Sequence, residues 1–256
     1  TCALPIFRIN RGRHEPAFRD AVAKAAPAIM GRGVVQLSGY VDLVLASLLA
    51  IGALARLRYA QTLYVLPVSL FGMSVAAAEL PDLARERAGA TSALRERAVA
   101  AVRRVAFYVV PSVVAFVILG DVLVAGLFRA GEFRAADVTI VWITLVGYSA
   151  GLLASASTRV YQSAFFALRD TATPARSAAL RAATAFVAGA VLMLQFEPVT
   201  LLGRTIPAGL FGGANVAGAP LGPLGLAIGA AVGAWVEWWL LKRRLARTVG
   251  AVGAGG

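Results

Sequence analysis

The run VAFYVVPSVVAFVILGDVLVAGLF occupies residues 105–128 and contains one charged residue, Asp121. A helix of about 20 mostly apolar residues crosses a bilayer, so this run predicts a transmembrane helix. The rest of the chain is similar in character: 59% of its 256 residues are hydrophobic, and its mean hydropathy is +0.75. A soluble domain is about half apolar, so the sequence predicts a membrane protein.

Further apolar runs predict six transmembrane helices in all. The expected spans are roughly 27–50, 62–80, 105–128, 137–168, 174–195 and 221–241. Between the second and third, the Arg- and Glu-rich stretch 82–104 predicts an amphipathic surface helix. The stretch 196–220 reads as a Pro/Gly-rich loop and 248–256 as a flexible tail. The expected fold is therefore an all-α polytopic membrane bundle over 1–256.

Lysine and arginine are distributed unevenly between alternating loops. The first set holds 17 of the 25 basic residues, and the second set holds 5. The first set is 1–26, 81–104, 166–177 and 242–256; the second is 51–61, 128–137 and 196–220. The positive-inside rule predicts that the first set and both chain ends face the cytoplasm, as in an inner-membrane protein. The net charge of +12 would suggest a nucleic-acid partner in a soluble protein. Here the basic residues lie between apolar runs, which favours a charge bias across the membrane, and we expect no nucleic-acid partner.

Several classes of chemistry are not expected. Cys2 is the one cysteine and His14 the one histidine, so neither an internal disulfide nor a Cys/His metal site can form. The sequence shows no group of residues typical of a catalytic nucleophile and its base, so we do not expect an enzyme. We also expect no metal site and no cofactor. The opening TCALPIF lacks an initiator Met, and we expect the chain to be a fragment of a longer protein.

The first predicted span is amphipathic. Arg32, Gln36 and Asp42 fall on its polar half, which must face protein or water because an ionisable group in hydrocarbon is costly. We expect Arg32 and Gln36 to line a cavity. Two roles stay open for Asp42: a structural ion pair with a neighbouring helix, or a place in a cavity or ion site.

Charged residues recur in the later spans. Arg159 lies about nine residues from the inner end of its helix, too deep to extend easily to the interface, and predicts a water-filled cavity. Arg181 is nearer the inner end and can extend there; it is also a candidate for an ion or structural pair, as are Asp42 and Glu237. Buried cations suit an anionic substrate, and arginine suits phosphate best. A helical bundle with such a cavity is typical of a transporter.

Glu237 lies above Gly229 and Gly233, whose four-residue spacing permits close helix packing. It is about one turn from Lys242, so a local ion pair is the expected role. The three nearby tryptophans predict an aromatic belt at the membrane interface. They are Trp235, Trp238 and Trp239.

The stretch RLRYAQTLYVLPVSLFGM, residues 56–73, opens with two arginines and Gln61. On the charge-based topology Arg56 and Arg58 lie near the outer face, where a positive-inside anchor is not expected. This placement favours a binding role for one or both. We expect Arg58 to face the cavity with Gln61, and Arg56 to act as an interfacial anchor.

Four segments carry a resemblance to one known family: residues 27–85, GLFRAGEF at 126–133, VYQSAFFALRDTATP at 160–174 and GPLGLAIGAAVGAWVEWWLL at 222–241. Together they resemble the MurJ (MviN) family of lipid II flippases. Residues 27–85, from PAIMGRGVVQ to AELPDLAR, resemble that family's seventh and eighth membrane helices. GLFRAGEF resembles its outer loop, VYQSAFFALRDTATP a helix end followed by an Asp-x-x-Thr-Pro turn, and GPLGLAIGAAVGAWVEWWLL its twelfth helix. The resemblance runs in order along nearly the whole chain.

The resemblance implies a two-lobed transporter of the multidrug/oligosaccharidyl-lipid/polysaccharide exporter superfamily, with a cationic central cavity and alternating access. The chain then corresponds to most of the second lobe, and the first lobe would be its missing partner. The implied substrate is an anionic lipid-linked peptidoglycan precursor, lipid II. Two alternatives stay open: an exporter of another polyprenyl-linked glycan or of a drug, and a membrane scaffold without transport activity.

One family position departs from the pattern. Where the family commonly has an arginine after Tyr-Ala-x, this chain has Thr62, and we expect Arg58, one turn earlier, to substitute for it. Asp42 matches an acid that helps bind sodium in some relatives, but the companion position is Gly189. Sodium therefore stays an alternative, and the membrane potential is the expected driving force.

Overall fold

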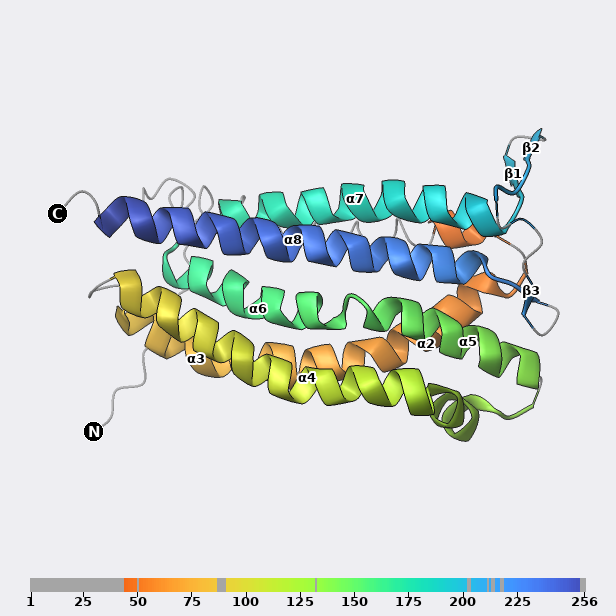
Figure 1. Ribbon diagram of the computed structural model, residues 1–256, viewed down its shortest axis with the longest axis horizontal. Coiled ribbons are helices and arrows are strands. Elements are labelled where there is room, and N and C mark those ends of the chain that lie inside the picture. The colour runs from red at the N-terminus through yellow and green to blue at the C-terminus, as the bar shows by residue number, and fades with distance from the viewer. Residues whose placement is uncertain are drawn as a thin grey trace, which may run out of the picture.

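The computed structural model describes residues 44–49, 51–86, 91–131, 133–201, 204–210, 212, 215–216 and 219–253. Within these ranges the chain is a bundle of long helices with two small hairpins at one end (Figure 1). The all-α membrane bundle predicted from the sequence is confirmed. Four helical stretches and one bent pair of helices are long and apolar enough to cross a membrane.

The first described span is a composite helix. It consists of α2 (Ala53–Pro67), the π-helical η1 (Val68–Met73) and α3 (Ser74–Glu86). Pro67 lies where the helix widens, and proline has no N–H to donate to the α-helical ladder. The span begins nine residues earlier than the predicted 62–80, so Arg56 and Arg58 lie on the helix itself. Most of the predicted span 27–50 lies outside the described residues.

Helix α4 (Thr91–Phe128) joins two predicted elements. The stretch 82–104 was expected to be a separate surface helix. Instead its first residues complete α3 and its last residues are the opening turns of α4. The same Arg- and Glu-rich composition that favours a surface helix also allows a membrane helix to continue beyond the bilayer.

The fourth predicted span, 137–168, is a pair of helices rather than one long helix. Helices α5 (Ala135–Ser149) and α6 (Leu152–Ala167) meet at a bend of 44°. A Cβ added to Gly151 would lie 2.7 Å from Cα of Ala231 on the last helix, so the bend packs backbone against backbone. The indole Nε1 of Trp235 donates to the carbonyl of Ala150 at 2.8 Å, satisfying an acceptor in the bend. Trp235 therefore bonds at the bend in the middle of this pair of helices, where the sequence predicted an interfacial position for it.

Helices α7 (Ala172–Phe196) and α8 (Gly222–Gly253) run side by side (Figure 1). Glycines of α8 form the seam, as the spacing of Gly229 and Gly233 predicts. A Cβ on Gly225 would lie 2.7 Å from Met193 N, and one on Gly233 would lie 2.8 Å from the carbonyl of Arg181. Such small residues allow backbones to approach closely in membranes.

The connection between α7 and α8 contains two antiparallel hairpins. They are β1 (Val199–Leu201) with β2 (Arg204–Ile206), and β3 (Asn215–Val216) with β4 (Ala219–Pro220). Helix α8 continues through 248–253, so most of the predicted flexible tail is helical. In Figure 1 the bent pair α5–α6 lies between α8 and α4, and α2 crosses the bundle obliquely.

Candidate functional site

The polar side chains form two clusters. The first, the α2 cluster, contains Arg56, Arg58, Gln61, Asp137 and Tyr148. Nε of Arg56 donates to Oδ1 of Asp137 at 2.8 Å, and the two side chains are 19% and 20% exposed. Asp137 also accepts the backbone N–H of Arg134 at the start of α5. Arg56 therefore ties α2 to α5, where the sequence predicted an interfacial anchor.

Arg58 is exposed and has a weaker set of partners than Arg56. Its Nη1 donates to Oε1 of Gln61 at 3.1 Å, and Nε2 of Gln61 donates to the hydroxyl of Tyr148 at 2.8 Å. Thr62 turns its hydroxyl back to the carbonyl of Arg58 at 2.9 Å. Among the described residues no carboxylate pairs with Arg58.

The second cluster, the α6 cluster, contains Ser155, Arg159, Gln162, Arg181 and Glu237. Glu237 is only 1% exposed, and Nη1 of Arg181 donates to its Oε2 at 3.1 Å. Nε2 of Gln162 donates to the other carboxylate oxygen at 3.0 Å. Both oxygens thus have partners from neighbouring helices, as a buried carboxylate requires.

One expectation for this cluster is corrected. Glu237 was expected to pair with Lys242, but the ammonium of Lys242 lies 4.6 Å from the centre of the Trp238 ring. Arg181, which the sequence left open as an ion-pair residue or as a residue extending to the interface, points inward to Glu237 and Ser155. A buried carboxylate attracts the cation that can reach it in a dry interior, even when that cation is 56 residues away in sequence.

Arg159 is held differently from Arg181. Its Nη1 donates to Oε1 of Gln162 at 3.3 Å, and among the described residues it has no carboxylate partner. Its Nε is buried and has no hydrogen-bond partner among the described residues. The hydroxyls of Ser157 and Thr158 are buried there without a partner as well. An unpaired buried donor is costly, so Arg159 is the cation of this cluster best able to accept an anion.

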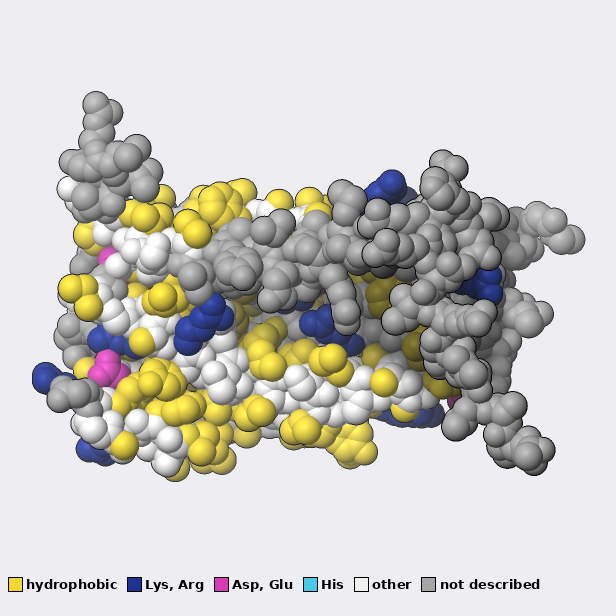
Figure 2. All heavy atoms as spheres, turned by 180° about the vertical axis from the view of Figure 1, so that it is seen from behind, with side chains coloured by type: hydrophobic (Ala, Val, Ile, Leu, Met, Phe, Trp, Pro, Cys, Tyr) yellow, Lys and Arg dark blue, Asp and Glu magenta, His cyan; other side chains and the backbone are white. Residues whose placement is uncertain are grey.

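A polar stripe joins the two clusters. The hydroxyl of Tyr64 donates to Oγ of Ser155 at 2.5 Å, and Nη2 of Arg181 reaches the same oxygen at 3.3 Å. The rings of Tyr64 and Tyr148 are 5.2 Å apart. Figure 2 shows basic side chains near the middle of one face, with apolar side chains above and below them.

The remaining predicted site residues are placed only in part. Arg32, Gln36 and Asp42 lie outside the described residues, so the sodium alternative stays a prediction. In the described part of the chain, no group of three His, Cys, Asp or Glu side chains could hold a metal ion. Gly189, the companion position, lies against the backbone of Gly229 in the α7–α8 seam.

The Asp-x-x-Thr-Pro turn begins α7. Oδ1 of Asp170 accepts the backbone N–H groups of Ala172 at 3.0 Å and Thr173 at 2.9 Å, which satisfies free donors of the first helical turn. Partial burial raises the pKa of Asp170, but the hydrogen bonds from Thr173 and Ala172 outweigh this and leave the pKa below its usual value. The motif is therefore a helix cap.

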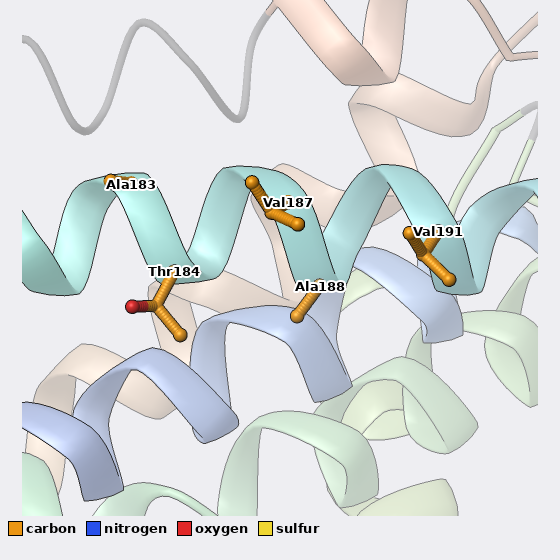
Figure 3. Close-up of a pocket in the computed structure, with 5 residues that line it drawn as sticks. All are labelled: Ala183, Thr184, Val187, Ala188 and Val191. Carbon is orange, nitrogen blue, oxygen red and sulfur yellow. The ribbon is translucent and has the colours of Figure 1, made fainter.

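A shallow apolar depression lies along α7 (Figure 3). The hydroxyl of Thr184, its one polar side-chain group, donates to the carbonyl of Leu180 at 2.8 Å. Without a charged or free polar group, this depression has no feature that would recognise an anion. Its lining residues are Ala183, Thr184, Val187, Ala188 and Val191.

Sequence reasoning missed Gln162, Tyr64 and Tyr148. A signal for Gln162 was present, because an Arg-x-x-Gln spacing recurs: RYAQ at 58–61 and RVYQ at 159–162 both place Gln three residues after Arg. Residues three apart are neighbours on a helix, so both pairs can bond. The tyrosines had no such local signal, since their partners lie on other helices.

Comparison with known proteins matches this chain to one family. The family model described as lipid II flippase MurJ matches residues 4–254. The probable lipid II flippase MurJ of Haemophilus influenzae is 28% identical over 86% of this chain and 40% of its own length. The lipid II flippase MurJ of Burkholderia cenocepacia is 30% identical over 68% of this chain and 34% of its own length.

A solved structure shares the fold. The chain superposes on lipid II flippase MurJ in an inward closed conformation with a TM-score of 0.71 at 20% identity, covering 86% of this chain and 41% of that one. The chain thus spans about a third to two fifths of the length of these relatives. Because the family model extends over nearly all of the sequence, the chain belongs to the lipid II flippase MurJ family.

Proposed function

We propose that this chain is most of the second lobe of a flippase that moves lipid II, the lipid-linked peptidoglycan precursor, across the inner membrane by alternating access. The observation that carries the proposal is the pair Arg58 and Arg159. Each is a cation on a membrane helix whose charge no described carboxylate neutralises. A pyrophosphate on a lipid carrier is an anion that such arginines can hold.

The cycle requires no covalent chemistry. Arginine binds phosphate oxygens through its fork of N–H donors, and it stays charged throughout. Alternating access then needs two lobes that rock against each other around the bound head group. The first lobe of the same protein is therefore the partner we propose, with the membrane potential as the driving force and sodium as the alternative.

The orientation follows from the charge distribution. The end of α8, the start of α4 and the turn from α6 to α7 lie at one end of the bundle, and the hairpins lie at the other (Figure 1). We assign the first, more basic end to the cytoplasm. Cysteines replacing Ala130 and Gly212 should react with an impermeant thiol reagent in intact cells, and one replacing Arg95 should not. External labelling at 95 contradicts the orientation.

The main test is a compensation at α2 in the complete flippase. Arg58→Ala should lose lipid II translocation, and adding Thr62→Arg should restore much of it. One turn separates the two positions, about 5.4 Å along the axis, which an arginine side chain can cover. Arg58→Lys should rescue only in part, because an ammonium cannot make the bidentate phosphate contact. Normal translocation by Arg58→Ala shows that Arg58 does not bind substrate.

Two controls define this test. Arg129→Ala removes an exposed arginine near the same end of the bundle and should leave translocation unchanged. Arg56→Ala should lower stability, because it leaves Asp137 without its partner on α2. Translocation of a different polyprenyl-linked glycan, but not lipid II, favours the other exporter; no translocation by any variant or the parent favours a scaffold.

A further inference from the structure

The two clusters share one arrangement. Each contains two arginines and one carboxylate, and one of the two arginines forms an ion pair with the carboxylate. The ion pairs are Arg56–Asp137 and Arg181–Glu237. In each cluster the other arginine donates to a glutamine three residues later. These pairs are Arg58–Gln61 at 3.1 Å and Arg159–Gln162 at 3.3 Å.

Each glutamine is itself anchored on another helix. Nε2 of Gln162 donates to Glu237 on α8, as Nε2 of Gln61 donates to Tyr148 on α5. The amide orientation of Gln162 follows from chemistry: arginine can only donate and a carboxylate can only accept. Gln162 must therefore present its oxygen to Arg159 and its NH2 group to Glu237. Anchoring the NH2 group fixes where the oxygen points, and with it the guanidinium.

Counted over the part of the chain that the structure describes, the α6 cluster is one anion short. Arg159 and Arg181 carry two positive charges against the single negative charge of Glu237. Among the described residues Nε of Arg159 is a buried donor without an acceptor. Inside a membrane protein an uncompensated cation is costly and usually marks a binding pathway. The group that would complete the cluster is an anion with at least two oxygens, since Nε and the Nη groups can bind two acceptors side by side.

We propose that Gln162, held by Glu237, is a positioning residue that aims the guanidinium of Arg159 at a phosphate group of the substrate. This inference rests on the proposed function, because the lipid-linked substrate supplies the phosphate. Glu237 has two effects on the site. As an acceptor it orients Gln162, and as a negative charge it opposes an incoming anion. Glu237→Gln tests the charge effect, because it removes the charge and keeps one of the two oxygens that accept hydrogen bonds.

The test measures binding of inorganic pyrophosphate to the purified complete flippase by calorimetry. Gln162→Leu removes one positioning bond and should weaken the Arg159-dependent binding by about 3- to 10-fold. Arg159→Leu should remove that binding and sets the baseline. Glu237→Gln should strengthen binding, because the cluster then carries one more net positive charge. If Gln162 and Glu237 had only a structural role, Gln162→Leu and Glu237→Gln would not shift the pyrophosphate affinity in opposite directions.

Gln195→Leu is the matched control. It makes the same substitution on α7, where Oε1 of Gln195 accepts the N–H of Leu210 at 3.0 Å, away from both clusters. Its pyrophosphate affinity should equal that of the parent protein. If Gln162→Leu does not fold, Gln162→Asn replaces it, since the shorter side chain keeps the amide but cannot bridge both partners. The same weakening is expected.

The outcomes separate this inference from the proposed function. Unchanged affinity in Gln162→Leu, or weakened affinity in Glu237→Gln, overturns the positioning role even if the parent protein translocates lipid II. Failure of the parent protein to translocate lipid II overturns the proposed function. Even then, opposite affinity shifts in the two variants support the positioning role.

Discussion

Helices α4 and α8 are both long enough to cross a membrane, yet they meet their surroundings differently. Helix α4 is the more apolar of the two. Only 22% of its most apolar, membrane-spanning stretch is buried inside the protein, whereas 50% of the corresponding stretch of α8 is buried. The outer face of α4 carries large exposed side chains such as Phe107, Ile118 and Leu127. Helix α8 instead presents glycines to its neighbours.

The difference has a simple cause. Lipid tails are as apolar as leucine, so a large apolar side chain gains little by leaving lipid for protein. Close packing and interhelical polar contacts are what hold membrane helices together. In this molecule, therefore, the glycines and the buried ion pair of α8 mark contact with other helices, and the large exposed side chains of α4 mark contact with lipid. Matched substitutions on the two helices test this rule.

The largest difference should come from the ion pairs. Arg181→Leu leaves Glu237 buried without its cation, and we expect a loss of about 3–5 kcal/mol in the free energy of unfolding. Arg104→Leu breaks the pair between Arg104 on α4 and Glu79, where the arginine is 65% exposed, and should cost less than about 1 kcal/mol. Thermal or denaturant unfolding in detergent measures both. Combining Arg181→Leu with Glu237→Leu should recover much of the loss, and equal costs for the two single variants contradict the rule.

Glycine substitutions should give the next largest effect. A Cβ at Gly229 would collide with the backbone of Gly189, so Gly229→Leu must push α7 and α8 apart, at a cost of about 3 kcal/mol. Gly126 on α4 has nothing within 4 Å of such a Cβ. Gly126→Leu should therefore keep or slightly raise the unfolding temperature. A larger loss at 126 than at 229 shows that the seam is not where the helices hold together.

A smaller effect should mark the one side of α4 that does pack. A Cβ at Gly120 would lie 2.5 Å from Cδ1 of Trp142, whose Nε1 donates to the carbonyl of Phe116 at 3.1 Å. Gly120→Ala must displace the ring, and we expect a cost of about 1–2 kcal/mol. Unfolding followed by tryptophan fluorescence measures it. An unchanged spectrum and stability indicate that α4 and α5 separate easily.

The smallest effect should come from the lipid face of α4. Ile118 is 67% exposed, so Ile118→Ala changes a side chain that contacts lipid in both the folded and the unfolded state. The free energy of unfolding should change by less than about 0.5 kcal/mol. The measurement is unfolding in detergent micelles. A loss above about 1 kcal/mol is typical of a packed side chain and would indicate that this face lies against another helix.

The spans within the described residues were predictable because hydrocarbon thickness sets a minimum length that an apolar run must satisfy. The limits of that reasoning appear at each helix end. Arg56 and Arg58 were placed in a loop because they are charged, although α2 already includes them. The bend after Ser149 was not predicted, since it depends on contact between Gly151 and Ala231 on α8.

Part of the α6 cluster could be listed from the sequence, but the partners of its residues could not. Arg159, Arg181 and Glu237 stood out because charges are rare in membrane spans. Their pairing depends on which helices are neighbours. Lys242 was the nearest cation to Glu237 in sequence, and Arg181 is its partner in space. Only local pairs, such as Arg159 with Gln162, could be read from spacing.

The hydrogen bond from Trp235 to the carbonyl of Ala150 couples the fluorescence of Trp235 to the angle between α5 and α6. Trp235 is one of four tryptophans, and its indole N–H contacts the carbonyl of Ala150 where the two helices meet. A straightening of α5 relative to α6 moves this carbonyl away from α8, and the emission of Trp235 would change with it. With Trp142, Trp238 and Trp239 replaced by phenylalanine, we expect the emission of Trp235 to report helix bending in real time without an attached dye.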